Sequence, residues 1–529
     1  MHLPRAKGAT EIDRSLKFAR LRRGFFQAKV PASVGLALSL LVAVSSSAHA
    51  ASANALPPGV KEIDVTNDTT RRWGEPQIAV NPKNPKNIVY TIVGLAFTNY
   101  CLEVREYDAA SPCASRKLPN GGSRNIGLGD NVPGFTMVSV WVSFDGGMTW
   151  KRSANVPGEI STFPRDHKAH KVRTESGDPM VSVGPDGSFY LGWDAIHYSD
   201  SPTTIVDFGG IAVSKSTDGG LTWGPTVLPG TKLDRPMMTA DLSTGIIYEA
   251  SSGALGPLST GDISVPETGP HTRHLTTSRD GVNWTTPQPM GGSGTSMSAA
   301  HGVLANVFTT TEENTLFADA NNELCGGAPK PCVLFQTTDT GATWSRHVVP
   351  ETEVAPAGRP MVAADPTKPG HFTVALLTRS TGEFHVYRTS DSGNTWSGPT
   401  IVSDDATKSH YQPSMAYGPK GDLVMMWKSR NAPAQVPPAA PPPGSGLPRM
   451  DVLAPYNLFA VRSKNGGATF SHPLKLNSVE SPAPDPRASA GDDLTYVAVT
   501  DEYAYLAYAS WASSERAGFL SIAKLSAFR

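Results

Sequence analysis

Short apolar runs alternate with turn-forming residues along most of this chain, and the runs come in pairs. Each pair is a short run of β-favouring residues, a turn built from Pro, Asp or Gly, and a second run of the same kind. Apolar runs of this length between turn residues predict strands, because helices need longer periodic segments. Seven such pairs occur, at residues 75–91, 178–193, 235–250, 295–308, 359–376, 412–427 and 493–508.

Most pairs continue into a third run that ends in a recurrent turn, Ser/Thr-x-Asp-x-Gly-x-Thr-Trp, as in "STDGGLTW" at 216–223. An aspartate in a tight turn accepts hydrogen bonds from backbone amides just ahead of it, glycine supplies the positive φ, and the Trp packs back as an apolar plug. Repetition predicts a structural role, since an active site is needed once, and calcium loops carry more acidic residues. The central residues of these Asp turns are Asp145, Asp218, Asp280, Asp339, Asp391 and, in a variant copy, Asn465.

A fourth strand follows each Trp, so the repeating unit is a four-stranded antiparallel sheet. Its repetition predicts an all-β protein with the fold of a β-propeller. Seven strand pairs favour seven blades, and six Asp turns leave six blades as the alternative. The last pair is followed by a third strand at 518–526 and then the chain ends, so we expect its missing fourth strand to come from 61–67. The Pro-rich segment 433–449 is interpreted as a loop inserted in blade six.

The N-terminal fifty residues have the pattern of an export signal. A basic segment at 17–29 precedes an apolar run at 34–44, and small residues then lead to an Ala-His-Ala cleavage pattern that ends at Ala50. The apolar run is shorter than the roughly 20 residues that span a bilayer. Arg22 and Arg23 leave a twin-arginine route open beside the ordinary secretory one. We therefore predict a secreted or periplasmic protein.

The mature part, 51–529, is expected to form a single propeller domain. The chain carries 50 Gly and 45 Pro among 529 residues, which suits many short strands joined by turns. Its formal net charge of −1 argues against nucleic acid or an anionic membrane surface as a partner. We expect a monomer that works without a cofactor or a bound metal.

The four cysteines form two close pairs in the sequence, Cys101 with Cys113 and Cys325 with Cys332. In an oxidising compartment each pair is expected to close one local loop by a disulfide bond. Metal binding is the weaker alternative, because neither pair has the companions of a zinc site nearby.

The Asp turns match the Asp-box, or BNR, repeat, and over residues 70–529 the chain resembles the sialidase superfamily of propellers. The resemblance implies that the Asp boxes lie on the face opposite the active site. We therefore expect the candidate site at the start of each innermost strand, around the central opening. The residues before the Pro of these strands, or at the equivalent position, are Glu75, Asp178, Arg235, Gly294, Arg359, Gln412 and Asp493.

The resemblance also implies roles for these residues. Sialidases clamp the substrate carboxylate with three arginines, and Arg235 and Arg359 are candidates for two of them. Tyr411 stands where the family's tyrosine nucleophile would, and Asp178 or Glu75 is the candidate general acid. The chain departs from the family at blade one, where "GEPQI" stands in place of an Arg-Ile-Pro motif.

Gln412 and Asp493 complete the expected substrate-binding residues. The alternative for every one of these charged residues is structural: charged groups around a propeller channel pair with one another and keep the opening solvated. His410, beside Tyr411, is interpreted as a solvated loop histidine rather than a base.

Three function classes follow. The first is an exo-acting glycoside hydrolase of sialidase type, acting on an acidic sugar. The second is a polysaccharide lyase for uronate polymers, in which Tyr411 is the base and an arginine neutralises the carboxylate. The third is a non-catalytic propeller that binds a glycan or a protein.

Overall fold

The computed structural model describes residues 55–68, 71–96, 136–154, 156, 173–198, 205–230, 234–253, 272–290, 296–307, 332–355, 360–378, 380–433, 454–483, 494–513 and 516–529. The predicted export signal and most of the 433–449 insertion lie outside these residues. All of the described residues belong to one compact unit, Ala51–Arg529.

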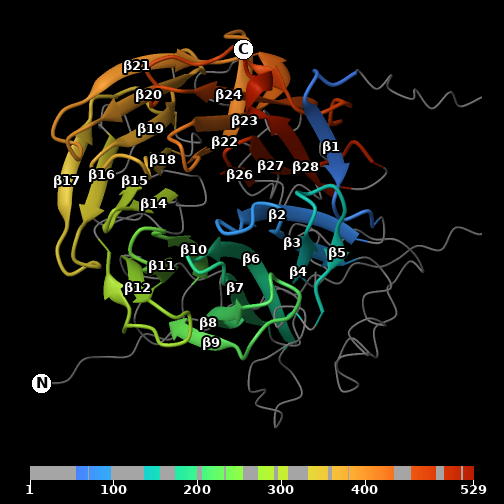
Figure 1. The fold of residues 1–529 in the computed structure, drawn as a ribbon, viewed down its shortest axis with the longest axis vertical. Helices are drawn as coiled ribbons and strands as arrows, with labels where there is room; N and C mark the ends of the chain where they lie inside the picture. The colour runs from blue at the N-terminus through green and yellow to red at the C-terminus, as the bar shows by residue number, and fades with distance from the viewer. Residues whose placement is uncertain are drawn as a thin grey trace, which may run out of the picture. The chain divides into compact units, whose positions relative to one another are not determined.

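The described residues form seven four-stranded antiparallel sheets, the blades of a β-propeller (Figure 1). The first strands of the blades are β2 (Arg71–Val80), β6 (Arg173–Val183), β10 (Asp234–Ala240), β14 (Ser296–Ala300), β18 (Met361–Ala364), β22 (Lys408–Tyr417) and β26 (Thr495–Val499). The second strands are β3 (Ile88–Ala96), β7 (Phe189–Tyr198), β11 (Ile247–Gly253), β15 (Val303–Val307), β19 (Phe372–Leu377), β23 (Leu423–Pro433) and β27 (Tyr503–Ser510).

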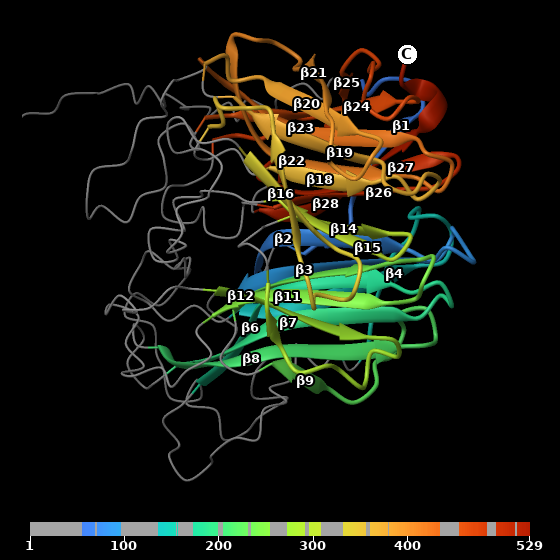
Figure 2. The ribbon, with the colours of Figure 1, turned by 90° about the vertical axis from the view of Figure 1, so that its left-hand side faces the viewer.

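The third strands are β4 (Thr136–Ser143), β8 (Ile205–Ser216), β12 (Thr272–Ser278), β16 (Cys332–Thr337), β20 (Phe384–Thr389), β24 (Tyr456–Ser463) and β28 (Ala517–Lys524). The fourth strands are β5 (Lys151–Arg152), β9 (Val227–Gly230), β13 (Gln288–Pro289), β17 (Ser345–Val349), β21 (Ser397–Val402), β25 (Leu474–Lys475) and β1 (Val60–Asp64). A short 3-10 helix, η5 (Leu525–Ala527), follows β28. Figure 2 shows the blades from the side.

Strand β1 closes the ring. It pairs antiparallel with β28, from Val60 opposite Ala523 to Asp64 opposite Phe519, and so supplies the outer strand of the last blade. The first strands contact one another in cyclic order, from β2 through β26 and back to β2, which places them innermost (Figure 1). The prediction of seven blades is confirmed, and the alternative of six is wrong because the N-terminal strand completes blade seven.

Apolar side chains fill the spaces between neighbouring blades. Trp427 of β23 is fully buried between blades five and six, where its ring centroid lies 5.9 Å from that of Phe384. Tyr456 of β24 is buried on the opposite face of blade six, against blade seven. Because both faces of a blade are buried, most second strands contain an apolar run, and each large side chain withdrawn from water stabilises the fold by about 1.5–3 kcal/mol.

The six Asp turns share one hydrogen-bond pattern. In the first, Asp145 Oδ1 accepts the amides of Met148 and Thr149, each at 2.9 Å, and Oδ2 accepts the Thr149 hydroxyl at 2.6 Å. Ser143 Oγ accepts the Gly147 amide at 2.8 Å. The other copies repeat the carboxylate bonds, and the variant copy uses the amide oxygen of Asn465. The carboxylates therefore accept the hydrogen bonds of donors within their own turns.

The second glycine of these turns packs on the preceding blade. Gly147 and Gly220 have φ of +87° and +91°, a region that suits glycine. A Cβ atom on Gly220 would lie 2.5 Å from Cγ2 of Val89 in blade one, and one on Gly147 would lie 2.9 Å from Cδ1 of Ile522 in blade seven. These positions need glycine both for the turn and for the close approach of two blades.

One of the four cysteines lies within the described residues. Cys332, at the start of β16, is buried and disulfide-bonded. Its predicted partner Cys325, and the pair Cys101 and Cys113, lie outside the described residues, so the pairing stays a prediction.

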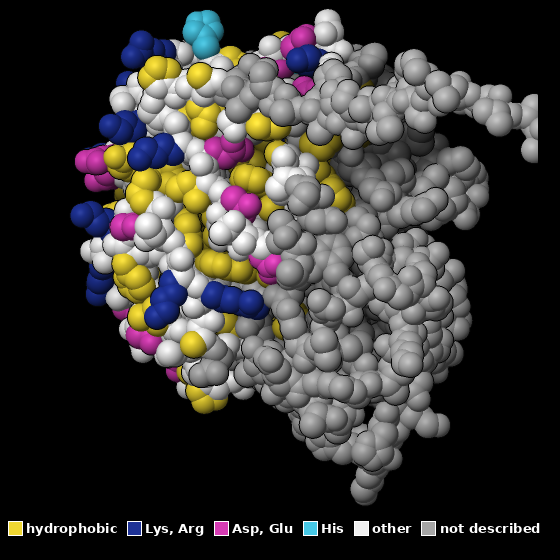
Figure 3. All heavy atoms as spheres, turned by 90° about the vertical axis from the view of Figure 1, so that its right-hand side faces the viewer, with side chains coloured by type: hydrophobic (Ala, Val, Ile, Leu, Met, Phe, Trp, Pro, Cys, Tyr) yellow, Lys and Arg dark blue, Asp and Glu magenta, His cyan; other side chains and the backbone are white. Residues whose placement is uncertain are grey.

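Among the described residues, no helix has the length and apolar character to cross a membrane. Where the side seen in Figure 3 is described, basic, acidic and apolar side chains are interspersed.

Candidate functional site

The Asp turns and those candidate site residues that the structure describes lie at opposite ends of the blades. In blade six, Ser463 at the Asp turn pairs with Leu423, and Leu423 pairs with Tyr417 at the end of β22. Tyr411, near the start of β22, pairs instead with Lys428. In blades one and two the strands pair in the same way, so the Asp turn again lies at the end of the blade away from the candidate residue. We call the end of the blades at which the innermost strands begin the mouth end.

Three of the predicted site residues occupy the same unusual backbone position. Glu75, Asp178 and Gln412 have φ of 56°, 44° and 48°, and the register of the sheet shifts across each of them. Each is followed by a proline. A left-handed non-glycine residue costs of order 1–3 kcal/mol, and bulges of this kind often lie beside active sites. The three bulges therefore place Glu75, Asp178 and Gln412 at equivalent positions of blades one, two and six.

The predicted arginine clamp is only partly within the described structure. Arg235 lies in β10, between Asp234 and Met237, where the register shifts as it does in blades one, two and six. Its side chain lies outside the described residues, and so do Arg359 and Asp493. The direction of both guanidinium groups therefore stays a prediction.

Tyr411 lies among cations. The Arg430 guanidinium carbon is 3.1 Å from the centre of the Tyr411 ring, and Lys428 Nζ is 5.5 Å from the same ring and 4.6 Å from that of Tyr456. Lys428 and Arg430 are fully buried. The Tyr411 hydroxyl is also buried and has no hydrogen-bond partner among the described residues. This cation–tyrosine cluster of Tyr411, Lys428, Arg430 and Tyr456 is suited to stabilising negative charge at the mouth end of blade six.

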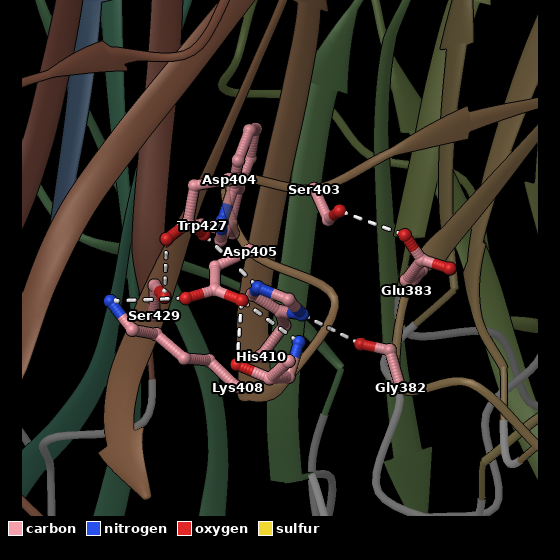
Figure 4. Close-up of polar contacts among 10 residues, drawn as sticks. Gly382, Glu383, Ser403, Asp404, Asp405, Lys408, His410, Trp427 and Ser429 are labelled. Atoms are coloured by element: carbon pink, nitrogen blue, oxygen red, sulfur yellow. Dashed lines mark hydrogen bonds and ion pairs between the residues drawn. The ribbon is translucent and has the colours of Figure 1, made fainter. Parts of the chain in front are cut away.

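His410, the neighbour of Tyr411, belongs to a second cluster on the other face of blade six (Figure 4). Its Nδ1 lies 2.6 Å from the Gly382 carbonyl oxygen and its Nε2 lies 3.0 Å from Asp404 Oδ1. Trp427 Nε1 donates to the same carboxylate at 2.9 Å, and the Ser429 hydroxyl donates at 2.8 Å. We call these residues the Asp404 cluster. The interpretation of His410 as a solvated loop histidine is wrong, because it lies in β22 and is only 3% exposed.

The hydrogen bonds of the Asp404 cluster keep its carboxylate ionised. Burial alone would raise the pKa of Asp404, but the bonds from His410, Trp427 and Ser429 outweigh burial and lower it. A carboxylate that accepts three donors is also firmly oriented. The two faces of blade six thus differ: one carries a buried anion with its donors, and the other carries two buried cations beside Tyr411.

The sequence reasoning missed the buried cations. Lys428 and Arg430 lie on β23, two residues apart, where alternation puts them on one face, and the apolar run "LVMMW" that precedes them suggests an ordinary core strand. Arg516 was missed as well: it is fully buried, and its Nε donates to the Trp73 carbonyl at 2.7 Å, beside the bulge at Glu75. A charged residue inside a strand with two buried faces is the signal that could have found them.

Blade three also buries polar groups. Ser251 pairs directly with His274, and Glu249 lies two residues before Ser251 on the same face of β11. All three are at most 1% exposed, and burial lowers the pKa of His274. Among the described residues, however, no group of three or more His, Cys, Asp or Glu side chains has the arrangement of a metal site.

Comparison with known proteins gives a likeness of fold. No protein-family model and no curated protein matches the sequence. Solved structures that match include the Hadza microbial sialidase Hz136 (16% identity, 76% of this chain and 75% of that one, TM-score 0.39). NanB sialidase of Streptococcus pneumoniae also matches, with 12% identity over 88% of this chain and 70% of that one and a TM-score of 0.40. A protein of unknown function from Dyadobacter fermentans matches with 12% identity over 88% of this chain and 99% of that one and a TM-score of 0.43.

Proposed function

We propose that this chain is a secreted, sialidase-like propeller that acts as an exo-glycoside hydrolase on sugars that carry a carboxylate. The cation–tyrosine cluster is the observation that carries the proposal. It combines a buried phenol with two buried cations, one of them stacked 3.1 Å from the ring. Attack at a sugar carbon that bears a carboxylate favours a neutral nucleophile such as tyrosine, because a carboxylate nucleophile would be repelled.

In this proposal Tyr411 is the nucleophile. Its oxygen bonds to the anomeric carbon as the bond to the leaving oxygen breaks, one of Glu75 and Asp178 accepts the phenol proton, and the other protonates the leaving oxygen. Water then attacks the same carbon and gives its proton to the carboxylate that had protonated the leaving group, while the tyrosine oxygen leaves and takes back its proton from the other carboxyl group. Arg430 and Lys428 offset the negative charge that develops on the tyrosine oxygen when it leaves.

The remaining candidates are assigned to substrate binding. Arg235 and Arg359 clamp the carboxylate of the sugar bidentately, and Gln412 and Asp493 contact its hydroxyl groups. The bulges at Asp178 and Gln412 and the register shift at Arg235 support this assignment, because they mark equivalent positions near the starts of three innermost strands. The Asp turns are Asp boxes with a purely structural role. The protein is exported by the signal before Ala51 and acts as a monomer on extracellular or periplasmic glycans.

The test is release of a fluorescent aglycone from a panel of sialosides and related acidic glycosides by the purified protein. Tyr411→Phe is expected to lower turnover by at least about 10³-fold, because the nucleophilic oxygen is lost. Tyr417→Phe is the matched control, since Tyr417 lies at the Asp-turn end of the same strand, where its hydroxyl lies 2.6 Å from that of Thr373. No release from any acidic glycoside, or equal turnover by both variants, would contradict the proposal.

One observation favours a lyase as the second candidate. Two cations, Lys428 and Arg430, lie over the ring of Tyr411, whereas sialidases place a glutamate beside their tyrosine. Cations suit a phenolate that removes the proton beside a uronate carboxylate. A lyase would generate an unsaturated uronate that absorbs in the ultraviolet, and a hydrolase would not. Binding without turnover, retained when Glu75 and Asp178 are replaced, would instead identify a non-catalytic glycan-binding propeller.

A further inference from the structure

The hydrogen bonds of His410 determine its charge. Both ring nitrogens face oxygen acceptors, the Gly382 carbonyl at 2.6 Å and the Asp404 carboxylate at 3.0 Å. A neutral imidazole has one N–H and can satisfy only one of them, whereas the imidazolium has two N–H donors. Asp404 does not supply the missing proton, because the hydrogen bonds that it accepts from Trp427 and Ser429 favour its ionised form. The geometry is therefore that of a buried imidazolium between two acceptors.

The groups around His410 suit a single positive charge on its ring. Its ring packs against the rings of Phe384, 5.9 Å away, and Trp427, 6.4 Å away. The nearby charges of Asp405 and Lys408 lie 3.9 Å apart and offset each other. Lys428 and Arg430 lie on the opposite face of β23. Asp404 is thus the counter-ion of His410.

His410 also occupies a particular place in β22. The register of this strand shifts twice, once between Lys408 and Ser409 and once between Tyr411 and Ser414. The segment between the two shifts has three residues, with His410 at its centre and Tyr411 at its end. The left-handed Gln412 follows directly, and such a conformation persists only where the surroundings hold it in place.

We propose that His410 is a positioning residue for Tyr411: a buried imidazolium, held by Asp404 and the Gly382 carbonyl, fixes the three-residue segment and so sets the phenol against Arg430. Because side chains alternate along a strand, the anchor acts from the blade-five side while Tyr411 points to the blade-seven side. The use of this position in catalysis rests on the proposed function, but the protonation and the anchoring do not.

The first test measures protonation. The purified protein is labelled with ¹⁵N-histidine, and the His410 signals are assigned from their loss in His410→Gln. At pH 7.5 both ring nitrogens of His410 are expected to be of the protonated type, with two ring N–H protons. His385, which has one ring nitrogen 2.7 Å from Glu351, serves as the internal comparison. A pyridine-type nitrogen on His410 at this pH would overturn the proposal.

The second test measures the position of Tyr411 without any substrate. In protein labelled with 3-fluorotyrosine, Tyr411→Phe assigns the ¹⁹F signal. His410→Gln and Asp404→Asn are expected to shift or broaden it, and His385→Gln, the control in blade five, is expected to leave it unchanged. An unmoved signal in both His410→Gln and Asp404→Asn would refute the anchoring role, even if both variants lose thermal stability.

The third test uses turnover. On any acidic sugar that the wild type cleaves, His410→Gln and Asp404→Asn should lower kcat about 10- to 100-fold with KM within about twofold, since small misplacements of a reacting group cost this much. The double variant should lose no more than either single variant, because the pair acts as a unit. Loss of stability with unchanged kcat would reject the positioning role. If the wild type cleaves nothing, the proposed function fails, and the fluorine signal alone decides the anchoring.

Discussion

Replacing Gly220 by alanine tests whether the Asp turns hold neighbouring blades together. Gly220 has φ of +91°, and an added Cβ would lie 2.5 Å from Val89 Cγ2 and 3.4 Å from Val142 Cγ1. The left-handed backbone costs an alanine roughly 1–2 kcal/mol. Because Val89 is fully buried and β-branched, it cannot swing aside, and overpacking of this kind adds about 1–3 kcal/mol. Gly220→Ala is therefore expected to lower the free energy of unfolding by about 2–5 kcal/mol.

The matched control is Gly146→Ala, which changes the first glycine of the Asp turn in blade one. Its φ is +78°, but its added Cβ meets only Tyr505 Oη at 3.7 Å, an ordinary contact. It should cost only the backbone part, about 1–2 kcal/mol. Urea unfolding followed by tryptophan fluorescence gives both values. If Gly220→Ala destabilises the protein no more than Gly146→Ala, the close packing of turn on blade does not contribute as argued.

The other predictions use different parts of the ring. Hydrogen bonds outweigh the effect of burial and lower the pKa of Glu351 from 4.5 to about 2, so its contribution to stability is full above about pH 4.5 and is lost as the pH falls toward 2. Unfolding measured against pH should show a larger loss of stability in the wild type than in Glu351→Gln, which keeps only the losses of the other carboxylates. Arg430→Met should lower kcat/KM on an acidic sugar about 100-fold or more. Arg462→Met, at the Asp-turn end of the same blade, should leave turnover unchanged, and equal losses would contradict the site. Glu62→Ala should cost about 1–3 kcal/mol in urea unfolding, because its carboxylate accepts hydrogen bonds from Ser478, in the segment after β25, and from Tyr508 of β27. Exposed Lys61→Ala on the same strand should be neutral within about 0.5 kcal/mol.

The repeat made most of the fold predictable. Seven strand pairs gave seven blades, and the unpaired third strand near the C-terminus required a partner that only an N-terminal strand could provide, as β1 does by pairing with β28. Residue types in the Asp turns predicted their hydrogen bonds. These features are predictable because each depends on local sequence repeated many times, and because antiparallel strands must find partners.

The site was less predictable. Reading the residue before each proline found the bulges at Glu75, Asp178 and Gln412, but it could not show that Arg430, eighteen positions after Gln412, returns to stack on Tyr411. Pairing across two strands brings them together, and strand register is not visible in one sequence. His410 was misjudged for the same reason, since its burial depends on partners in a loop and in another blade.

The pairing of β1 with β28 has a consequence for synthesis. The strand that seals the circle leaves the ribosome among the first residues of the fold, while its neighbour, Ala517–Lys524, is made more than four hundred residues later. Until then the innermost contacts of blades one and seven are also unmade, so the nascent chain cannot reach its closed state. Contacts this distant in sequence slow folding, and the waiting strand is an edge that must be kept from pairing elsewhere.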